Sequence, residues 1–467
     1  MIKKLIFVFS FVLLGSSFSQ NNALSEYVNT SIGTGGHGHT FPGAVAPFGM
    51  VQLSPDTRND ASWDGCGGYY YHDSFIYGFS HTHLSGTGVS DFGDILFQPM
   101  VNPSFKPEEY KALFTHQNEI TKAGYYAVSF ADNNIRIELT STPYTGFQKY
   151  TFSDDVDHWV LVDLEHRDKL LSHHLDIEKF TGGVKIRGHR QSQQWANNQW
   201  VFFESVISSP VSEIRYNRNK TKALLRFVND QIMVRTTLSF TGMEGVDKNT
   251  KATRALFADA DDNFGLSNIS LEQEFTKARR WCRTAWNAEL SRIEIEPESA
   301  SENFEKQQVL PERYGQLWSS MNDSVSATQR VIFYTALYHC MIHPSLASDA
   351  DGSYRGRDQL IHKAKHRYYH VFSLWDTYRA LHPLLLLINK QRTKEFILTM
   401  LLQYEQGGRL PVWELGSCET DCMIGFHSVP VIADAVLQGI EFDSSQRRRI
   451  MNAVIHSSDY KEKSYTY

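Results

Sequence analysis

Acidic side chains gather in the span Gly408–Asp434, where Glu414, Glu419 and Asp421 lie in a loop-like stretch before a predicted helix. Two carboxylates that face one substrate can perform general acid–base chemistry, as in the hydrolysis of glycosidic bonds. Glu419 is the first candidate for such a role. A carboxylate on the solvated surface is the alternative, and composition alone does not decide between the two.

A tryptophan and an aspartate are adjacent in the stretch Phe372–Pro383 (FSLWDTYRALHP). Asp376 could accept hydrogen bonds from paired hydroxyls of a sugar, while Trp375 offers a flat apolar face. Aspartate is also common in the first turn of a helix, where it stabilises the helix N-terminus. A helix cap is therefore the alternative role for Asp376.

Glycine and histidine dominate two stretches of the N-terminal half. His37 and His39 alternate with glycines in Asn29–Pro55, and glycine allows a backbone to approach a ligand closely. This loop lacks the GxxxxGK[ST] pattern of a phosphate-binding loop, and a structural loop is the alternative. His81 and His83 are two apart in GFSHTHLSGTG, so on a strand they would point the same way. Such a pair could bind a metal or sugar hydroxyls, or serve a structural role.

The stretch Trp63–Tyr71 (WDGCGGYYY) precedes that histidine pair and places Trp63 beside Asp64. The five cysteines are an odd number, so at least one is not paired within the chain. Cys418 and Cys422 are four apart, a spacing that could suit a metal on a helix. Without a second Cys/His pair at matching spacing, structural zinc is disfavoured.

The elements that would position these residues divide the chain in two. Its 467 residues exceed the roughly 250–300 that one hydrophobic core supports, so two domains are expected. Short segments rich in β-branched and aromatic residues, separated by turn clusters, predict a β-sandwich in the first half. These segments are 125–131, 135–140, 159–163, 200–205 and 231–238.

The second half has helical periodicity with short connections, which predicts antiparallel helix pairs. The predicted helices are 271–290, 302–320, 325–341, 374–389, 392–405, 427–439 and 444–456. The polar stretch His343–Val371 is predicted to be a long irregular segment. The domains are expected to be a β-sandwich over 20–265, a helical linker over 266–300, and about half of an (α/α)6 toroid over 301–467.

Composition narrows the function. The charged fraction of 21% and hydrophobic fraction of 41% are those of a globular protein. The net charge of −6 and the lack of a basic stripe exclude a nucleic-acid partner. Residues 1–19 read as a signal peptide, with Lys3 and Lys4 before an apolar run and Ser17 and Ser19 before the expected cleavage point. No apolar run is long enough for a membrane span, so a periplasmic or secreted protein is expected.

The four motif-bearing stretches, in this order, resemble glycoside hydrolase family 92 over about residues 27–467. Their family-like strings are SIGTGGHGHTFPGA, GFSHTHLSG, FSLWDTYRALHPL and the CMIG-containing span around Glu419. The resemblance implies a sandwich packed on an (α/α)6 domain, with the active site between them. It also implies a calcium-dependent exo-α-mannosidase that inverts anomeric configuration and acts on N-glycans, mannan or related α-mannosides.

The resemblance assigns side chains of this chain to the sugar side of the cleft. The residues implied to bind substrate are Trp63, Asp64, His81, His83, Trp375, Asp376 and Glu419. Cys418 stands where an asparagine is more usual in the family. Strings that carry the family's general acid and base do not occur, so both are expected beyond Tyr467, and the resemblance implies a C-terminally truncated chain without its catalytic pair. The calcium site is expected to be incomplete, because calcium needs about six to eight oxygen ligands.

Two other functions fit these observations. A non-catalytic mannoside-binding protein would keep the sandwich face of the cleft without hydrolysing the sugar. Another sandwich-plus-toroid carbohydrate enzyme, such as a disaccharide phosphorylase, would also place carboxylates in its helical domain.

Overall fold

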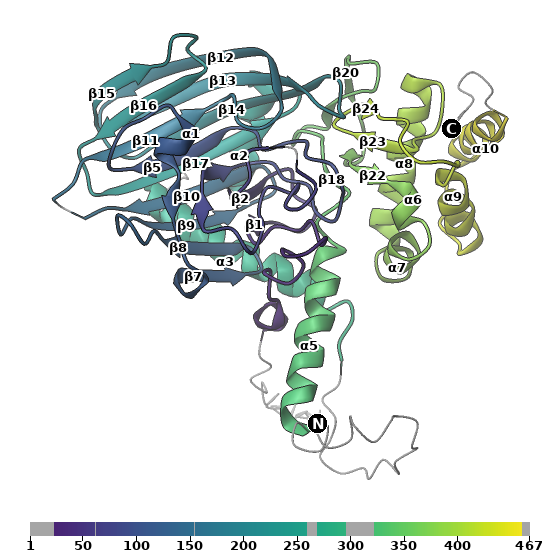
Figure 1. The fold of residues 1–467 in the computed structure, drawn as a ribbon. Helices are drawn as coiled ribbons and strands as arrows, with labels where there is room; N and C mark the ends of the chain where they lie inside the picture. The colour runs from purple at the N-terminus through teal and green to yellow at the C-terminus, as the bar shows by residue number, and fades with distance from the viewer. Residues whose placement is uncertain (1–22, 61, 154, 259–268, 296–321, 460–467) are drawn as a thin grey trace, which may run out of the picture.

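The computed structural model describes residues 23–60, 62–153, 155–258, 269–295 and 322–459. The expected signal peptide and the predicted helix over 302–320 lie outside these residues. The described part forms two stacked antiparallel sheets, followed by a helical region on one side of them (Figure 1). No helix within the described ranges is long and apolar enough to cross a bilayer.

The first sheet has the strand order β1-β2-β4-β5-β11-β16-β15. Its strands are β1 Ala44–Val45, β2 Gln52–Asp56, β4 Gly78–Ser80, β5 Leu96–Met100, β11 His158–Asp163, β15 Val211–Tyr216 and β16 Lys222–Phe227. The second sheet has the order β12-β13-β14-β17-β10-β9-β8-β7. Its strands are β7 Glu119–Lys122, β8 Tyr125–Ser129, β9 Arg136–Ser141, β10 Thr145–Thr151, β12 Lys169–Phe180, β13 Gly183–Gln193, β14 Gln199–Ile207 and β17 Gln231–Ser239.

The five predicted strand segments correspond to β8, β9, β11, β14 and β17. Alternate side chains of both sheets, such as Val160, Val162, Ile137 and Leu139, are fully buried and share one core. This alternation is the pattern of two sheets that pack face to face. The sandwich-like fold predicted for the first half is therefore present.

The helices are η1 Leu24–Tyr27, α1 Pro107–Tyr110, η2 His116–Asn118, α2 Met243–Ala255, α3 Leu271–Leu290, α5 Asn322–His339, α6 Leu374–Thr377, α7 Leu381–Ile388, α8 Lys390–Gly407, α9 Ser428–Leu437 and α10 Ser444–Ser458. Helix α3 has the predicted bounds and begins at a capping box between Ser270 and Gln273. Its buried stripe faces the sandwich, where Trp286 Nε1 donates to the carbonyl oxygen of Val45 at 2.7 Å. The linker helix is thus part of the sandwich core.

The stretch His343–Val371 is more regular than predicted. It forms β18 Ser345–Leu346, which pairs with β21 Tyr369–His370, and β19 Ser353–Arg355, which pairs with β20 Ile361–Lys363. The short strands β22 Phe372–Ser373, β23 Trp413–Leu415 and β24 Cys418–Glu419 make a further sheet beside α8 (Figure 1), and β3 Phe75–Ile76 pairs with β6 Ala112–Leu113. Two-residue strands carry too little periodicity to be recognised in a sequence.

Candidate functional site

Sandwich loops and the β22–β24 sheet meet in one apolar cluster. The sandwich contributes Leu84, Val89, Phe92 and Ala196, and the helical half contributes Val371, Trp413, Leu415 and Cys418. Asn198 and Gln359 link the two sides, because the Asn198 amide donates to Gln359 Oε1 at 3.2 Å. The motifs of both halves border this cluster, so it brings together stretches about 300 residues apart.

Trp63 and Asp64 lie on the sandwich side, against the glycine- and histidine-rich stretch. The Trp63 ring is 59% exposed and packs edge-on to His39, with ring centroids 4.8 Å apart. Asp64 Oδ1 lies 2.7 Å from Nδ1 of His37. The Trp63 ring also lies so close to Gly88 that a Cβ there would come within 2.5 Å of it. The exposed pair Trp63–Asp64 is therefore held by both motif stretches.

His81 and His83 point into the sandwich. The strand β4 ends at Ser80, and the two rings, which are at most 1% exposed, have different partners. His81 Nδ1 donates to the carbonyl oxygen of Ile95 at 2.7 Å, and burial lowers the pKa of His81 to about 4. The described residues hold no group of three His, Cys, Asp or Glu side chains that could bind a metal. Contact of either histidine with a sugar stays a prediction.

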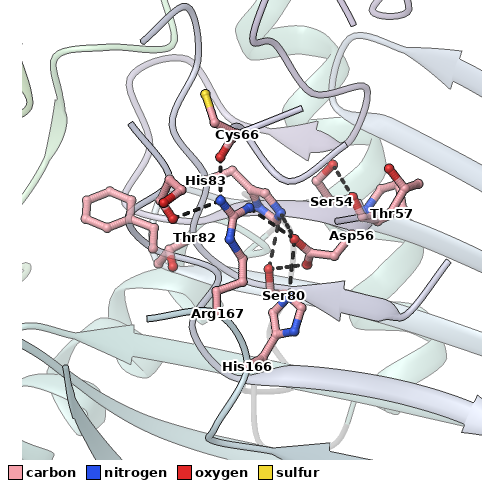
Figure 2. Close-up of polar contacts among 12 residues, drawn as sticks. Ser54, Asp56, Thr57, Cys66, Ser80, Thr82, His83, His166 and Arg167 are labelled. Atoms are coloured by element: carbon pink, nitrogen blue, oxygen red, sulfur yellow. Dashed lines mark hydrogen bonds and ion pairs between the residues drawn. The ribbon is translucent and has the colours of Figure 1, made fainter. Parts of the chain in front are cut away.

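His83 belongs to a buried polar network around Asp56 (Figure 2). Its Nδ1 donates to the carbonyl oxygen of Gln52 at 2.8 Å, and its Nε2 lies 3.2 Å from Asp56 Oδ1. Ser80 Oγ donates to Asp56 Oδ2 at 2.5 Å. Burial alone would raise the pKa of Asp56, but His83 and His166 hold that pKa well below its usual range. Asp56 is therefore an ionised carboxylate in the core.

Arg167 connects this network to the loops that carry the candidate site. Its Nη2 donates to the carbonyl oxygens of Cys66 and, at 2.8 Å, Ser90, while Nη1 lies 3.7 Å from Asp56 Oδ1 (Figure 2). The bond to Cys66 fixes the loop that presents Trp63. Residue types and spacing gave no sign of this network, because its members come from separate strands and loops.

On the helical side, Trp375 and Asp376 follow β22 in the short helix α6. Trp375 is 37% exposed. Asp376 lies in the first turn of α6, as the helix N-terminal alternative expects, although the N-cap residue is Ser373, whose Oγ donates to Asp376 Oδ2 at 2.5 Å. This bond engages one carboxylate oxygen and orients the carboxylate. The pair Trp375–Asp376 is thus accessible, as a ligand site requires.

Glu419 is buried and hydrogen-bonded to the backbone, unlike a carboxylate that is free to act as an acid or base. Its carboxylate accepts hydrogen bonds from the backbone N–H groups of Val412, Trp413 and Asp421, at 2.8–3.2 Å, and the side chain is 7% exposed. Arg357 Nη2 lies 3.6 Å away. These contacts hold the β23–β24 hairpin and the loop after it together. A direct contact with substrate stays a prediction.

Glu414 is the second buried carboxylate of this sheet. It accepts hydrogen bonds from the backbone N–H groups of Val371, at 3.0 Å, and Ser417, at 2.7 Å. Burial raises the pKa of Glu414 to about 8, and the nearby Glu419 adds to the rise. Cys418 and Cys422 lie on β24 and in the loop after it, so they do not share the helix that their spacing could suit.

Comparison with known proteins accounts for both halves of the chain. Residues 27–255 match the glycosyl hydrolase family 92 N-terminal domain, and residues 260–466 match the glycosyl hydrolase family 92 catalytic domain. Over 178 residues the chain is 28% identical to an uncharacterized secreted glycosidase of Arthroderma benhamiae, covering 35% of this chain and 23% of that protein.

Solved structures agree with this assignment. A family GH92 alpha-mannosidase from Bacteroides thetaiotaomicron, in complex with mannoimidazole, is 28% identical and superposes with a TM-score of 0.78 over 94% of this chain. A family GH92 inverting mannosidase from Bacteroides thetaiotaomicron VPI-5482 shares the fold at 24% identity, with a TM-score of 0.75 over 94% of this chain. The chain spans 56% of the length of each of these two proteins. With both of its halves matched in order, the chain belongs to glycosyl hydrolase family 92.

Proposed function

We propose that this chain supplies the sugar-binding walls of an exo-acting α-mannosidase, which releases terminal mannose from α-mannosides such as N-glycans or mannan. The observation that carries the proposal is that an exposed Trp–Asp pair from each half lies near the shared apolar cluster. The Trp63 ring lies against Gly88, next to the cluster residue Val89, and Asp376 lies near Cys422, which packs against the cluster. The 28% identical relative whose structure contains mannoimidazole supports mannose as the sugar.

The proposed binding mode follows from the side chains. A tryptophan face packs against the apolar C–H face of a sugar ring, while a carboxylate accepts hydrogen bonds from neighbouring hydroxyls. Asp376 has the carboxylate geometry for this role, because Ser373 holds one of its oxygens and orients the other. Trp375 and Trp63 supply the apolar faces.

For the catalytic step we propose inversion by direct displacement, in which an acid protonates the leaving oxygen and a base activates water. In inverting enzymes the two carboxyl groups are about 6.5–9.5 Å apart. Glu414 and Glu419 are not assigned to these roles, because backbone N–H groups already occupy their oxygens. The proposal places the acid and base in a helical toroid of which α5–α10 form a part.

Calcium remains a proposal for this family member. When bound beside the terminal sugar it would act as a Lewis acid that orients hydroxyl groups. The described residues do not gather three His, Cys, Asp or Glu side chains suited to a metal, so the catalytic step is proposed without calcium.

Export by a cleavable signal peptide over residues 1–19 is also proposed. It is supported by the secreted relative.

A second function is favoured by the hydrogen bonds that Glu414 and Glu419 make. Because Glu414 and Glu419 are both committed to backbone hydrogen bonds, the described residues form a site that could bind a mannoside without hydrolysing it. The partner in either case is an α-mannoside glycan.

The test is mannose release from α-1,2-mannobiose by the purified chain, with calcium and with a chelator, alongside calorimetric binding of methyl α-mannoside. Calcium-dependent release supports the enzyme, and binding without release supports the second function. Trp375→Ala and Asp376→Asn should each weaken binding by at least about tenfold, whereas Tyr216→Ala, an exposed aromatic on β15, should not. No heat with any mannoside would overturn sugar binding altogether.

A further inference from the structure

A polar cavity of about 190 Å³ opens on the sandwich side of the interface. Its lining comes from four loops and consists of Asn59, Asp60, Ser90, Arg167, Asp168 and Gln194. The floor residues Ser90 and Asp168 are buried, and the Arg167 side chain is 2% exposed, whereas Asn59, Asp60 and Gln194 form an exposed rim. Ligand cavities that enclose drug-sized molecules measure roughly 300–1,000 Å³, so this one suits a single ring with its outer face exposed.

The mixture of donors and acceptors in the lining limits what the cavity can bind. Arg167 and the amides of Asn59 and Gln194 offer N–H groups, and Asp60 and Asp168 offer carboxyl oxygens. An anion would be repelled by the Asp60 carboxylate, and a metal cation would be repelled by the guanidinium. Adjacent hydroxyls of a neutral polyol both donate and accept, so they match such a lining.

One donor on the floor has no partner within the described residues. Arg167 Nε is buried and unbonded, although Nη2 of the same guanidinium is fully used by Cys66 and Ser90. A buried N–H without a partner costs about 1–3 kcal/mol, so such a group is expected to find one when the protein functions. Because this nitrogen is shielded from solvent, the groups that a ligand can reach directly are those of the exposed rim, Asn59, Asp60 and Gln194.

An exposed aromatic residue follows the rim residue Gln194 in the chain. Trp195 follows Gln194 at the tip of the β13–β14 hairpin and is 46% exposed. Its backbone N–H donates to Asp91 Oδ2 at 3.2 Å, and the N–H of Ala196 donates to Asp91 Oδ1 at 2.7 Å. Gln194 Nε2 donates to Ser90 Oγ at 3.4 Å. The hairpin tip is therefore held in place by the loop that forms the cavity floor, which reduces the entropy lost on binding.

We propose that this cavity and Trp195 form an outer subsite for a second or third sugar unit of an extended mannoside, separate from the terminal-sugar position at Trp375 and Asp376. The proposal rests on the proposed sugar-binding function and specifies its substrate as an oligosaccharide. The rim residues Asn59, Asp60 and Gln194 contact the hydroxyls of the outer sugar, and Trp195 packs against its ring. Because the tip is fixed through backbone N–H groups, truncation of the Trp195 side chain leaves those bonds in place.

The experiment compares the calorimetric affinity of methyl α-mannoside with that of sulfur-linked mannotrioses, which resist hydrolysis, in α-1,2, α-1,3 and α-1,6 linkages. For the unmodified chain, at least one trisaccharide should bind about tenfold more tightly than the monosaccharide. Trp195→Ala and Gln194→Ala should remove most of that gain and leave the monosaccharide affinity within about twofold. Phe180→Ala, an exposed aromatic at the β12–β13 hairpin, is the matched control and should change neither affinity.

The outcomes separate this proposal from the function on which it rests. If the monosaccharide binds but no trisaccharide binds more tightly, or if Trp195→Ala retains the full gain, the outer subsite is overturned while sugar binding stands. If neither ligand binds, the proposed function and the subsite both fail. Unfolding curves in urea for each variant show whether a lost affinity reflects a lost fold.

Discussion

The carboxylate of Glu419 accepts a hydrogen bond from the backbone N–H of Trp413 at 2.8 Å, across the β23–β24 hairpin. The same carboxylate also receives the N–H groups of Val412 and Asp421. Glu419 therefore accepts hydrogen bonds from backbone N–H groups that the short β23–β24 pairing leaves without a partner. This is a structural role for the Glu419 carboxylate.

Glu419→Ala should destabilise the chain by roughly 2–4 kcal/mol, because it leaves buried N–H groups without an acceptor and Arg357 without its counter-charge. Urea unfolding followed by circular dichroism measures this loss. Glu405→Ala is the control, since Glu405 pairs with Arg449 on the surface and its removal should cost at most about 1 kcal/mol. Equal losses in the two variants would contradict the structural role of Glu419.

Arg190 is a cation that is fully buried in the sandwich, and its replacement by methionine should cost about 3–5 kcal/mol. Nη1 pairs with Asp94, and the other nitrogens donate to the carbonyl oxygens of Leu164, His166 and Asp168. The substitution leaves Asp94 buried without a cation to compensate its charge. Thermal and urea unfolding should both show the loss.

Arg226→Met is the matched control for Arg190, because Arg226 pairs with Asp157 while both side chains are more than two-fifths exposed. An exposed pair contributes at most about 1 kcal/mol. If the Arg190 variant lost no more stability than this control, the buried pair would not be a structural requirement of the sandwich.

The strands and helices were largely predictable because their signals are local. β-Branched and aromatic alternation located β8, β9, β11, β14 and β17, and the 3.6-residue period located α3 and α8. The capping residue Ser270, at the start of α3, is a signal of the same kind. The short strands between residues 343 and 371 escaped prediction because pairing between distant segments, not periodicity, creates them.

The candidate site was only partly predictable, since a sequence shows residue types but not which way they point. Trp63 and Trp375 are exposed, as a site requires, whereas His81 and His83 are buried and bonded within the sandwich. Arg167 was missed altogether. Its role arises from contacts with Asp56, Cys66 and Ser90, and no spacing in the sequence encodes those contacts.

Glu414 should make stability fall as the pH rises. Burial raises its pKa to about 8, so between the ordinary carboxyl pKa of about 4.3 and this value the folded chain binds a proton that the unfolded chain has lost. Stability then declines with pH by up to about 1.36 kcal/mol per unit across this window and levels off above it. Glu414→Gln mimics the protonated form and should remove this decline.

The measurement for Glu414 is the urea midpoint of the natural chain and the variant at pH 6.5, 7.25 and 8. The difference in unfolding free energy between the variant and the natural chain should increase with pH. Glu405→Gln, which changes an exposed carboxylate, should show a constant difference. A constant difference for Glu414→Gln would mean that Glu414 is ionised in the folded chain.

His382 gives the opposite dependence on pH. Its ring is 2% exposed, stacks near Phe372, and has no hydrogen-bond partner for either nitrogen among the described residues. Burial lowers its pKa to about 4, so the unfolded chain takes up a proton below pH 6.5 that the folded chain takes up only near pH 4. The stability contributed by the neutral ring is therefore present above pH 6.5 and is lost as the pH falls through this window.

His382→Phe keeps an aromatic ring in the same space and removes both the unbonded nitrogens and the titration. We expect the variant to be about 1 kcal/mol more stable at pH 7, because desolvated nitrogens no longer have to be buried. Its advantage should grow as the pH falls from 6.5 toward 4, as measured by urea unfolding at several pH values. His174→Phe, on the exposed face of β12, should show no such growth. If the advantage of His382→Phe shrank at low pH, the folded chain would have to hold His382 protonated, with an acceptor in contact with its ring.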